Sequence, residues 1–226
     1  MEDFDKFAHD YKTILDDSIK LGGEKGEYFS TYKANYVSRH IGKDFAGKIL
    51  DYGCGIGLLS KDLLIHLPHA KVDGFDVSVA SIEHVPENLK KQGHFTSDLN
   101  LLAQDYDLIV IANVLHHIEL PQRAAVIAKL KKLVKNEGKI IIFEHNPFNP
   151  LTRKIVKDSP LDKGVILLPF PEVLSYLKKA GFKKLQSNYI VFFPKFLANL
   201  RPAEPYLSWL PLGAQYVAMG QVKEHA

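Results

Sequence analysis

The sequence predicts an α/β fold built on an open, doubly wound and mostly parallel sheet. The first observation is residues 48–67, where a short apolar strand runs into a glycine-rich turn and then into leucines at helical spacing. The second is residues 71–76, another short strand that ends in an acidic residue. The third is residues 106–112, a near-continuous apolar run, which fits a central parallel strand covered on both faces. Strands that alternate with helical segments in this way are typical of α/β sheets.

The glycine turn after the first strand is a candidate ligand-binding corner. Glycine lets the backbone approach a ligand closely, and the helix that follows presents its N-terminus to the same place. The glycines are Gly53, Gly55 and Gly57, whereas the dinucleotide fingerprint has glycines at relative positions one, three and six. Here position six is Leu58, and Asp51 just before the turn would repel a pyrophosphate. A carboxylate at this place suits a ligand with a positively charged end.

A second acidic residue strengthens this interpretation. Asp76 ends the strand 71–76 and follows Gly57 by 19 residues. At about this distance beyond the glycine turn, an acidic side chain binds ribose hydroxyls in nucleotide-binding βαβ units. The two patterns together therefore predict a ligand that carries a nucleoside.

These residues resemble the first motifs of the class I S-adenosylmethionine (SAM) methyltransferases. The match is Asp51-x-Gly53-Cys54-Gly55-x-Gly57 followed by Asp76. The resemblance implies a Rossmann-like, seven-stranded sheet whose last strand is antiparallel, with SAM as cofactor and S-adenosylhomocysteine as product. It implies these cofactor-binding residues along the sheet: Asp51, Gly53, Cys54, Gly55, Gly57, Asp76, Val77, Asp98, Leu99 and Asn113.

Residues 3–41 precede the sheet and read as two helices with an aromatic stripe. Many methyltransferases of this class carry an N-terminal extension that closes over the cofactor, so residues 1–44 are expected to form a helical lid. Tyr11 and Tyr28 are its candidate contacts to SAM or to the substrate. The alternative is an aromatic stripe that only packs on the core. Lys33 is expected to be a solvated lysine, and the alternative is contact with an anionic group.

The segment between the glycine corner and the central strand contains one further cofactor candidate. Ser78 predicts an N-cap, and Pro86 is expected to break or kink the helix that Ser78 starts. A short strand is expected near residues 94–96. The resemblance then places Asp98 near the adenine amino group, and the alternative is an ordinary turn aspartate.

Candidate catalytic residues follow two buried strands, 106–112 and 139–143. Asn113 to His117 come directly after the first, and Glu144 to Asn146 after the second. Residues just past the carboxyl ends of such strands lie at the ligand crevice of an open α/β sheet. His117, His145 and Glu144 are therefore the candidate general bases. The alternative is that these polar groups only anchor their loops.

The remaining segments are assigned by their turn residues. A helix that begins near Pro121 should end at 136–138, and another should cover 171–181 and stop at its glycine. Two strands are expected near 184–193 and 214–222. Residues 146–170 and 194–213 are expected to be insertions in a single domain that covers residues 1–226. The second is long for a loop and is expected to shape the acceptor site, touch a partner chain or rest on a membrane surface.

Composition limits the function classes. The chain is 46% hydrophobic and 24% charged, with a net charge of +3 and scattered lysines, so a nucleic-acid partner is not expected. Cys54 is the only cysteine, which excludes a disulfide framework and a cysteine-rich metal site, and no metal is expected. No transmembrane span is expected either, and with an acidic N-terminus the cytoplasm is the expected location. The oligomeric state is left open.

The predicted function is transfer of a methyl group from SAM to a small-molecule acceptor, such as a sugar or another metabolite. The sulfonium is already activated, so alignment supplies most of the catalysis, and a base helps only where the acceptor must lose a proton. Asn113 is followed by Val-Leu-His, which differs from the DNA amino-methyltransferase motif, and no Pro-Cys nucleophile is present. The alternative is a non-catalytic SAM-binding protein of the same fold. A nucleotide-dependent oxidoreductase is disfavoured by the glycine spacing.

Overall fold

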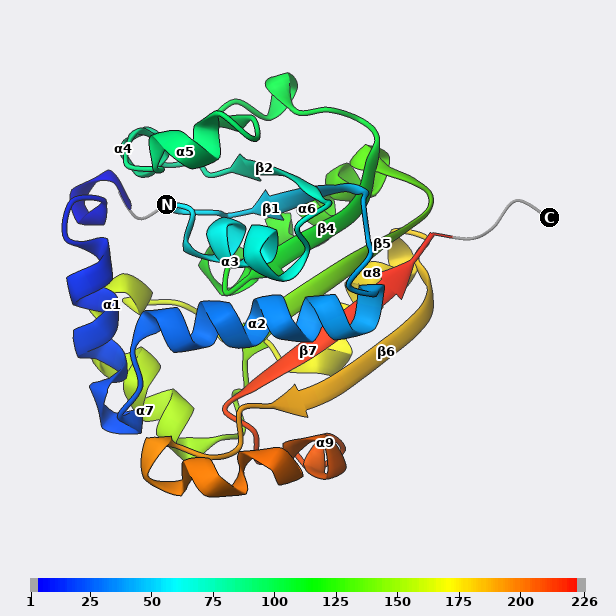
Figure 1. Ribbon diagram of the computed structural model, residues 1–226. Helices are drawn as coiled ribbons and strands as arrows, with labels where there is room; N and C mark the ends of the chain where they lie inside the picture. The colour runs from blue at the N-terminus through cyan, green and yellow to red at the C-terminus, as the bar shows by residue number, and fades with distance from the viewer. Residues whose placement is uncertain (1–3, 223–226) are drawn as a thin grey trace.

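A seven-stranded sheet runs through the centre of the molecule in the order β3-β2-β1-β4-β5-β7-β6 (Figure 1). The structure, a computed structural model, describes residues 4–222. Only β7 runs antiparallel to its neighbours β5 and β6, so the predicted mostly parallel sheet with an antiparallel last strand is confirmed. The strands are β1 (Lys48–Tyr52), β2 (Lys71–Phe75), β3 (Phe95–Thr96), β4 (Tyr106–Ala112), β5 (Val134–His145), β6 (Lys183–Ile190) and β7 (Gln215–Gln221).

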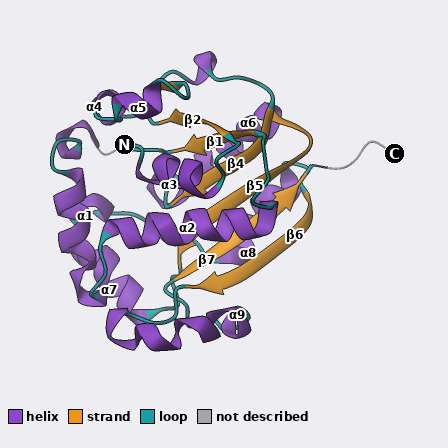
Figure 2. Cartoon of the chain, viewed as in Figure 1, coloured by secondary structure: helices purple, strands orange, loops and turns teal. Residues whose placement is uncertain are grey.

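Helices cover both faces of this sheet, as Figure 2 shows. Side chains alternate along β4: Leu108 and Val110 pack with α2 and α3, whereas Ile109 and Ile111 pack with α6 and α8. Burial on both faces explains why β4 is almost continuously apolar. The α-helices are α1 (Tyr11–Ile19), α2 (Gly26–Ile41), α3 (Leu58–His66), α4 (Val79–Glu83), α5 (Glu87–Lys90), α6 (Leu120–Leu133), α7 (Pro150–Asp158), α8 (Phe170–Lys179) and α9 (Glu204–Leu207).

The strand order reverses between β1 and β4, and the carboxyl ends of the central strands meet beside this switch point. Hydrogen bonds tie the turns there to neighbouring strands. The backbone N–H groups of Gly53 and Cys54 both donate to Phe75 O, over 2.7 and 3.0 Å. The N–H of Asn113 donates to Phe143 O over 2.9 Å. The sheet therefore holds the loops after β1, β2, β4 and β5 at one edge.

Most elements lie where the sequence predicts them, with one clear shift. Ser78 caps α4 by accepting a hydrogen bond from Ser81 N over 3.0 Å, and Pro86 separates α4 from α5. The helix expected to end at 136–138 instead ends at Leu133, because Val134 already pairs with Tyr106 across a bulged register. The strand after it therefore starts five residues earlier than expected.

The N-terminal helices and the predicted insertions gather at the carboxyl edge of the sheet. Helix α1 packs against α7 and against the 3-10 turn η5 (Pro160–Asp162), as Figure 1 shows for α1 and α7. The second insertion forms the 3-10 segment η6 (Lys195–Ala203) and then α9. Residues 1–3 of the predicted lid lie outside the described residues, and the closing motion and the single-domain organisation stay predictions.

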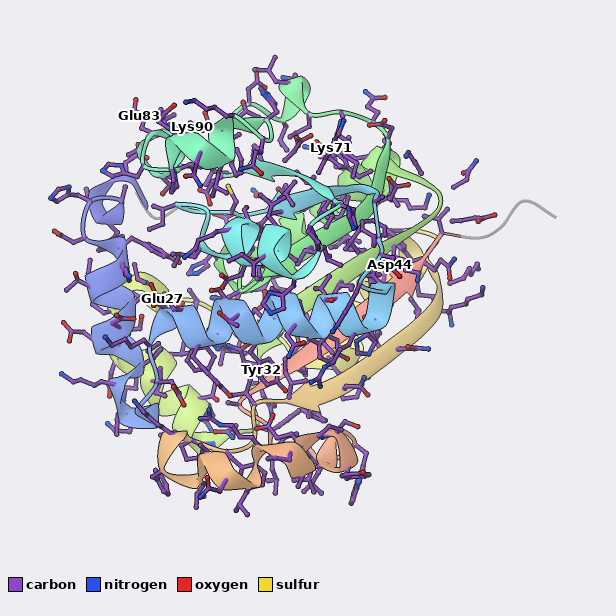
Figure 3. All side chains as sticks on the ribbon, viewed as in Figure 1. Glu27, Tyr32, Asp44, Lys71, Glu83 and Lys90 are labelled. Carbon is purple, nitrogen blue, oxygen red and sulfur yellow. The ribbon has the colours of Figure 1, made fainter. Side chains whose placement is uncertain are left out.

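One buried carboxylate anchors the second insertion to the core. Tyr32 of α2 lies on the side of that helix that faces η6 and α9 (Figure 3), and its hydroxyl donates to Glu204 over 2.9 Å. Glu204 also accepts from the N–H groups of Phe192 and Phe193 over 2.9 and 3.2 Å. Residues 195–213 are thus a structured part of the fold. Among residues 4–222, no helix is both long and apolar enough to cross a membrane.

Candidate functional site

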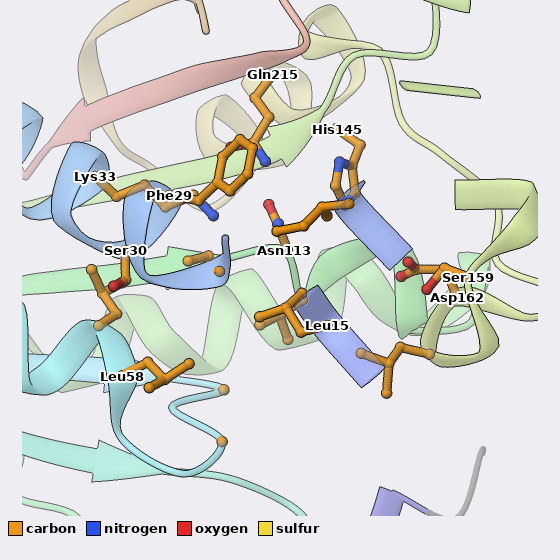
Figure 4. A pocket seen from close by; sticks show the side chains of 18 of the residues that line it. Leu15, Phe29, Ser30, Lys33, Leu58, Asn113, His145, Ser159, Asp162 and Gln215 are labelled. Carbon is orange, nitrogen blue, oxygen red and sulfur yellow. The ribbon is translucent and has the colours of Figure 1, made fainter. Parts of the chain in front are cut away.

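A cavity of about 420 Å³ opens at the carboxyl edge of the sheet. Its walls are formed by the ends of β1, β2, β4 and β5, by α1 and α2, and by the predicted insertions. Figure 4 shows Lys33 entering from α2, with Asn113 and Gln215 towards the middle of the pocket and Asp162 at its far end. The glycine turn and the two histidine loops therefore share one cavity, although they lie apart in the sequence.

The glycine turn forms a wall of this cavity. Gly53 has a φ of +80°, and a Cβ there would lie 2.2 Å from Val114 Cγ2. Gly55 has a φ of +51°, and a Cβ there would meet no atom within 4 Å, because it would project into the open cavity. Both positions favour glycine, the first for packing and the second for close approach of a ligand.

Two carboxylates flank the turn. Asp76 accepts hydrogen bonds from the N–H groups of Gly55 and Ser78 over 2.8 and 2.9 Å. Asp51, which is 1% exposed, accepts from Ser60 Oγ over 2.6 Å. Burial raises the pKa of Asp51 to about 6, with the hydrogen bond from Ser60 opposing the shift. Both carboxylates line the cavity, so a cationic ligand group would relieve the cost of burying them.

A buried lysine faces the same cavity. Lys33 is 6% exposed, and its ammonium lies 6.0 Å from the centre of the Phe143 ring. Burial lowers the pKa of Lys33 to about 8, although the nearby carboxylates of Glu144 and Asp51 act in the opposite direction. No ion pair within 4.0 Å is present for Lys33 in the described structure. Its ammonium is therefore available to an anionic group in the cavity.

Three histidines occupy the opposite end. His117 and His145 line the cavity, and burial lowers the pKa of each to about 4, so both rings are neutral at pH 7. His116 lies behind them and its Nδ1 donates to Glu144 over 2.6 Å. Burial opposes the charged ring of His116, but the carboxylates of Glu144 and Asp162 outweigh it and raise its pKa to about 9.

Several buried polar atoms at this cavity make no hydrogen bond. Among the described residues, the buried side-chain atoms without a partner include Tyr28 Oη, Asn113 Oδ1, His145 Nδ1, Ser159 Oγ and Gln215 Oε1. All five residues line the cavity. Since buried polar groups are nearly always hydrogen-bonded, this set points to a polar ligand that completes them.

The structure brings most of the predicted site residues to this cavity. Its lining includes Tyr11, Tyr28, Asp51, Gly53, Cys54, Gly55, Asp76, Val77, Asn113, His117 and His145. It does not include Gly57, Asp98, Leu99 and Glu144. Whether the lining residues bind the cofactor or act in catalysis remains a prediction.

The residues outside the cavity have local roles. Asp98 caps a 3-10 turn by accepting from Asn100 N over 2.9 Å, the alternative that its sequence left open. Gly57 starts α3, and a Cβ there would meet Leu89 at 3.1 Å. Glu144 is fully buried and accepts from the N–H groups of Val114 and Leu115 as well as from His116. Glu144 therefore shapes the histidine loop, and its expected role as a base is not supported.

The expectation of a solvated Lys33 is wrong, because its side chain is buried against the core. His116 belongs to the range 113–117 that the sequence singled out, whereas Ser159 and Asp162 were missed. Lys33 had a signal, because it lies one helical turn after Phe29 and so shares the stripe that faces the core. Asp162 had none, since it follows an irregular proline-containing segment whose path no periodic pattern predicts.

Comparisons with known proteins agree with this geometry. The profile of a family described as a methyltransferase domain matches residues 50–140. A ubiquinone biosynthesis O-methyltransferase of Photobacterium profundum is 30% identical over 122 residues, which are 48% of this chain and 48% of that protein. A malonyl-[acyl-carrier protein] O-methyltransferase of Halalkalibacterium halodurans is 27% identical over 194 residues, 79% of this chain and 70% of that protein. The chain thus matches about half the length of the first relative.

Solved structures share the whole fold. A SAM-dependent methyltransferase of Thermotoga maritima, described as a possible histamine N-methyltransferase, has a TM-score of 0.68 at 18% identity, over 97% of this chain and 98% of that one. The magnesium protoporphyrin IX methyltransferase of Synechocystis, solved with bound S-adenosylhomocysteine, has a TM-score of 0.65 at 17% identity, over 97% and 96%. The chain therefore has the fold of the class I SAM-dependent methyltransferases, and its residues 50–140 match a methyltransferase domain.

Proposed function

We propose that this protein transfers the methyl group of SAM to a hydroxyl oxygen of a small-molecule acceptor. The observation that carries the proposal is the single cavity in which the glycine turn, two buried carboxylates and two histidine side chains meet. Its unpartnered polar atoms and the open space in front of Gly55 suit a polar cofactor that lies along the backbone. When bound, SAM supplies a methyl group on a sulfonium that is already activated for displacement.

The residues at the glycine end would hold the cofactor in extended contact. Asp76 would accept hydrogen bonds from the ribose hydroxyls while it keeps the turn in place through Gly55 N. Asp51 would attract the α-ammonium group of the methionine end, and Lys33 would pair with its carboxylate. One acid and one base facing the same cavity suit a zwitterion better than they suit a neutral ligand.

The histidine end would hold the acceptor. His145 lines the cavity and its buried Nδ1 has no hydrogen-bond partner, so this ring is the one proposed to accept a proton from the acceptor. Apolar side chains of Leu161 and Phe192 line the cavity as well, which favours an acceptor with an apolar part. The names of the two relatives above, both O-methyltransferases, support oxygen as the acceptor atom. A sugar hydroxyl fits this description as one member of a broader class.

The main competing function is SAM binding without methyl transfer. The glycine turn, Asp51, Asp76 and Lys33 would be needed in either case, so the histidine end distinguishes the two functions. A non-catalytic protein has no need of an unpartnered imidazole at the acceptor end of the cavity. Product formation, not cofactor affinity, is therefore the deciding measurement.

The test is an activity screen with methyl-labelled SAM. Purified protein is incubated with metabolite extracts, and mass spectrometry identifies products that carry the labelled methyl group. On the acceptor so found, His145→Ala should lower kcat by about 10²–10⁴ with nearly unchanged SAM affinity, while the surface variant His84→Ala should match wild type. If kcat is unchanged in His145→Ala, His145 is not the general base. If no extract gives a labelled product, that result would favour SAM binding without methyl transfer.

A further inference from the structure

Two histidines and an aspartate converge at the acceptor end of the cavity. His116 and His117 belong to the 3-10 turn η4 (Leu115–His117) after β4, and Asp162 ends η5. One oxygen of Asp162, Oδ1, lies 3.2 Å from His116 Nε2 and 3.5 Å from His117 Nε2. The three possible ligand atoms lie within 4.8 Å of one another. Three donors from two elements, η4 and η5, thus lie around one small volume.

These separations suit a shared metal ion. A first-row divalent ion binds imidazole nitrogen and carboxylate oxygen at about 2.0–2.2 Å, so two ligands of one ion lie about 3.0 Å apart in octahedral geometry and about 3.4 Å apart in tetrahedral geometry. Both Asp162 distances fall close to this range. Two nitrogen donors and one carboxylate are also a donor set that transition metals prefer to the harder Mg²⁺ and Ca²⁺.

The surroundings of His116 match those of a metal ligand. Its Nδ1 donates to the buried carboxylate of Glu144, which fixes the ring and directs Nε2 towards Asp162. Histidines that bind metals almost always donate their second nitrogen to a carboxylate, a carbonyl or water in this way. Glu144 is itself held by two backbone N–H groups, so the orientation of the ring is rigid.

An independent observation comes from unpartnered atoms beside the cluster. Ser159 is 4% exposed and its hydroxyl has no hydrogen-bond partner, although it lines the cavity one turn before Asp162. The unpartnered Nδ1 of His145 belongs to a ring whose centre is 5.1 Å from that of His116. Figure 4 shows Ser159 and Asp162 together at one end of the pocket. These groups could bind water or substrate oxygens on an ion.

We propose that His116, His117 and Asp162 bind a divalent transition-metal ion, with Zn²⁺ as the reference case, at the acceptor end of the cavity. The proposal departs from the expectation of no metal, which rested on the lack of a cysteine-rich site. The three donors come from segments that are distant in sequence. An ion there would face the cavity and bind the acceptor oxygen, lowering the pKa of its hydroxyl group. This catalytic role rests on the proposed function, whereas binding of the ion does not.

Metal binding is tested on the tag-free full chain after dialysis against a chelator. Co²⁺ is added while its visible absorption is recorded, and Zn²⁺ and Mg²⁺ are titrated by calorimetry. One equivalent of Co²⁺ and of Zn²⁺ should bind, with Mg²⁺ much weaker. Loss of the group that orients a metal-binding histidine costs about 10–100-fold in metal affinity, so Glu144→Gln should lose affinity in that range. His117→Ala and Asp162→Asn each remove a ligand and should lose more than about 100-fold. His84→Ala should bind like wild type.

The result that overturns the site is equally clear. If wild type binds no equivalent of Zn²⁺, or if Asp162→Asn and His117→Ala bind as tightly as wild type, the cluster is a network of hydrogen bonds and ion pairs. Thermal unfolding of each variant checks folding. Should a variant unfold, NMR of the wild type still tests the site. Addition of Zn²⁺ should shift the side-chain ¹⁵N resonances of two histidines, because two histidines share the site. Unchanged resonances would reject the proposal. Methyl transfer is assayed separately, so failure of that activity leaves the metal result standing.

Discussion

The carboxylate of Asp76 accepts a hydrogen bond from the backbone N–H of Gly55 over 2.8 Å. This contact joins the end of β2 to the glycine turn after β1, and the other carboxylate oxygen accepts from Ser78 N. Asp76 therefore serves the fold and the proposed ribose contact at once. Each oxygen keeps acceptor capacity for a ligand hydroxyl, because a carboxylate oxygen has more than one acceptor site.

Replacing Asp76 should weaken SAM binding. Charge-assisted hydrogen bonds contribute roughly 1.5–3 kcal/mol each, so Asp76→Ala should raise the Kd for SAM by about tenfold or more in calorimetry. Asp98→Ala is the matched control, since Asp98 is acidic, follows the next strand and lies outside the cavity. If Asp98→Ala cost as much affinity as Asp76→Ala, that result would support the adenine contact implied by the resemblance.

The Gly55 position should reject a side chain. Gly55→Val places atoms in the open space in front of the turn and adds strain at a φ of +51°. SAM binding should be lost while the circular dichroism spectrum stays close to that of wild type. Gly181→Val separates the two effects, because Gly181 has a φ of +93° and lies outside the cavity. Gly181→Val should therefore strain the backbone without loss of SAM binding. If Gly55→Val binds SAM normally, the cofactor lies elsewhere.

These first predictions use the part of the site that local sequence patterns can reveal. A glycine turn, a strand that ends in an acid and a central apolar strand are each readable within about ten residues. The sheet topology then brings their ends together. Asp162 differs, because its approach to His116 depends on how residues 147–161 cross the edge of the sheet. Asp98 shows a different limit, since the family pattern implies a ligand contact while the structure shows the side chain capping a 3-10 turn.

Asp51 should make SAM affinity depend on pH. Its pKa is raised by burial to about 6, so the carboxylate is mostly ionised at pH 7 and becomes protonated as the pH falls through about 6. The α-ammonium of SAM remains charged below about pH 7.7, so the attraction is lost on the acidic side only. Calorimetry should show affinity falling by about tenfold for each pH unit below the pKa.

The neighbours of Asp51 set the control for this measurement. Asp76 also faces the cavity with a pKa raised by burial, and Lys33 remains protonated throughout the acidic range. Asp51→Asn removes only the first carboxylate, so its affinity should be lower at pH 7.5 and should fall less steeply than that of wild type from pH 7 to 5. An unchanged slope in Asp51→Asn would assign the dependence to another group.

The anchor of the second insertion should be measurable as stability. Glu204→Ala leaves the N–H groups of Phe192 and Phe193 and the hydroxyl of Tyr32 without their acceptor. Buried groups left unpaired in this way cost roughly 1–3 kcal/mol, so the free energy of unfolding in urea should fall by at least that amount. Tyr32→Phe should lose about 1 kcal/mol, and the exposed Glu83→Ala should change little. Equal stability of all three variants would mean that residues 195–213 pack independently of Glu204.

Lys33 offers the sharpest test of how the cofactor is oriented. The side chain is buried at the cavity, with no ion pair in the described structure, so an anionic ligand group would gain a strong charge-assisted contact there. Lys33→Met keeps much of the apolar stem and removes the charge, and it should raise the Kd for SAM by about tenfold or more.

Decarboxylated SAM lacks the carboxylate that Lys33 is proposed to bind. Wild type should therefore bind this analogue more weakly than SAM, whereas Lys33→Met should bind both with similar affinity. If Lys33→Met weakened both ligands equally, the lysine would act through the fold or through the acceptor end, and the methionine carboxylate would have to lie elsewhere.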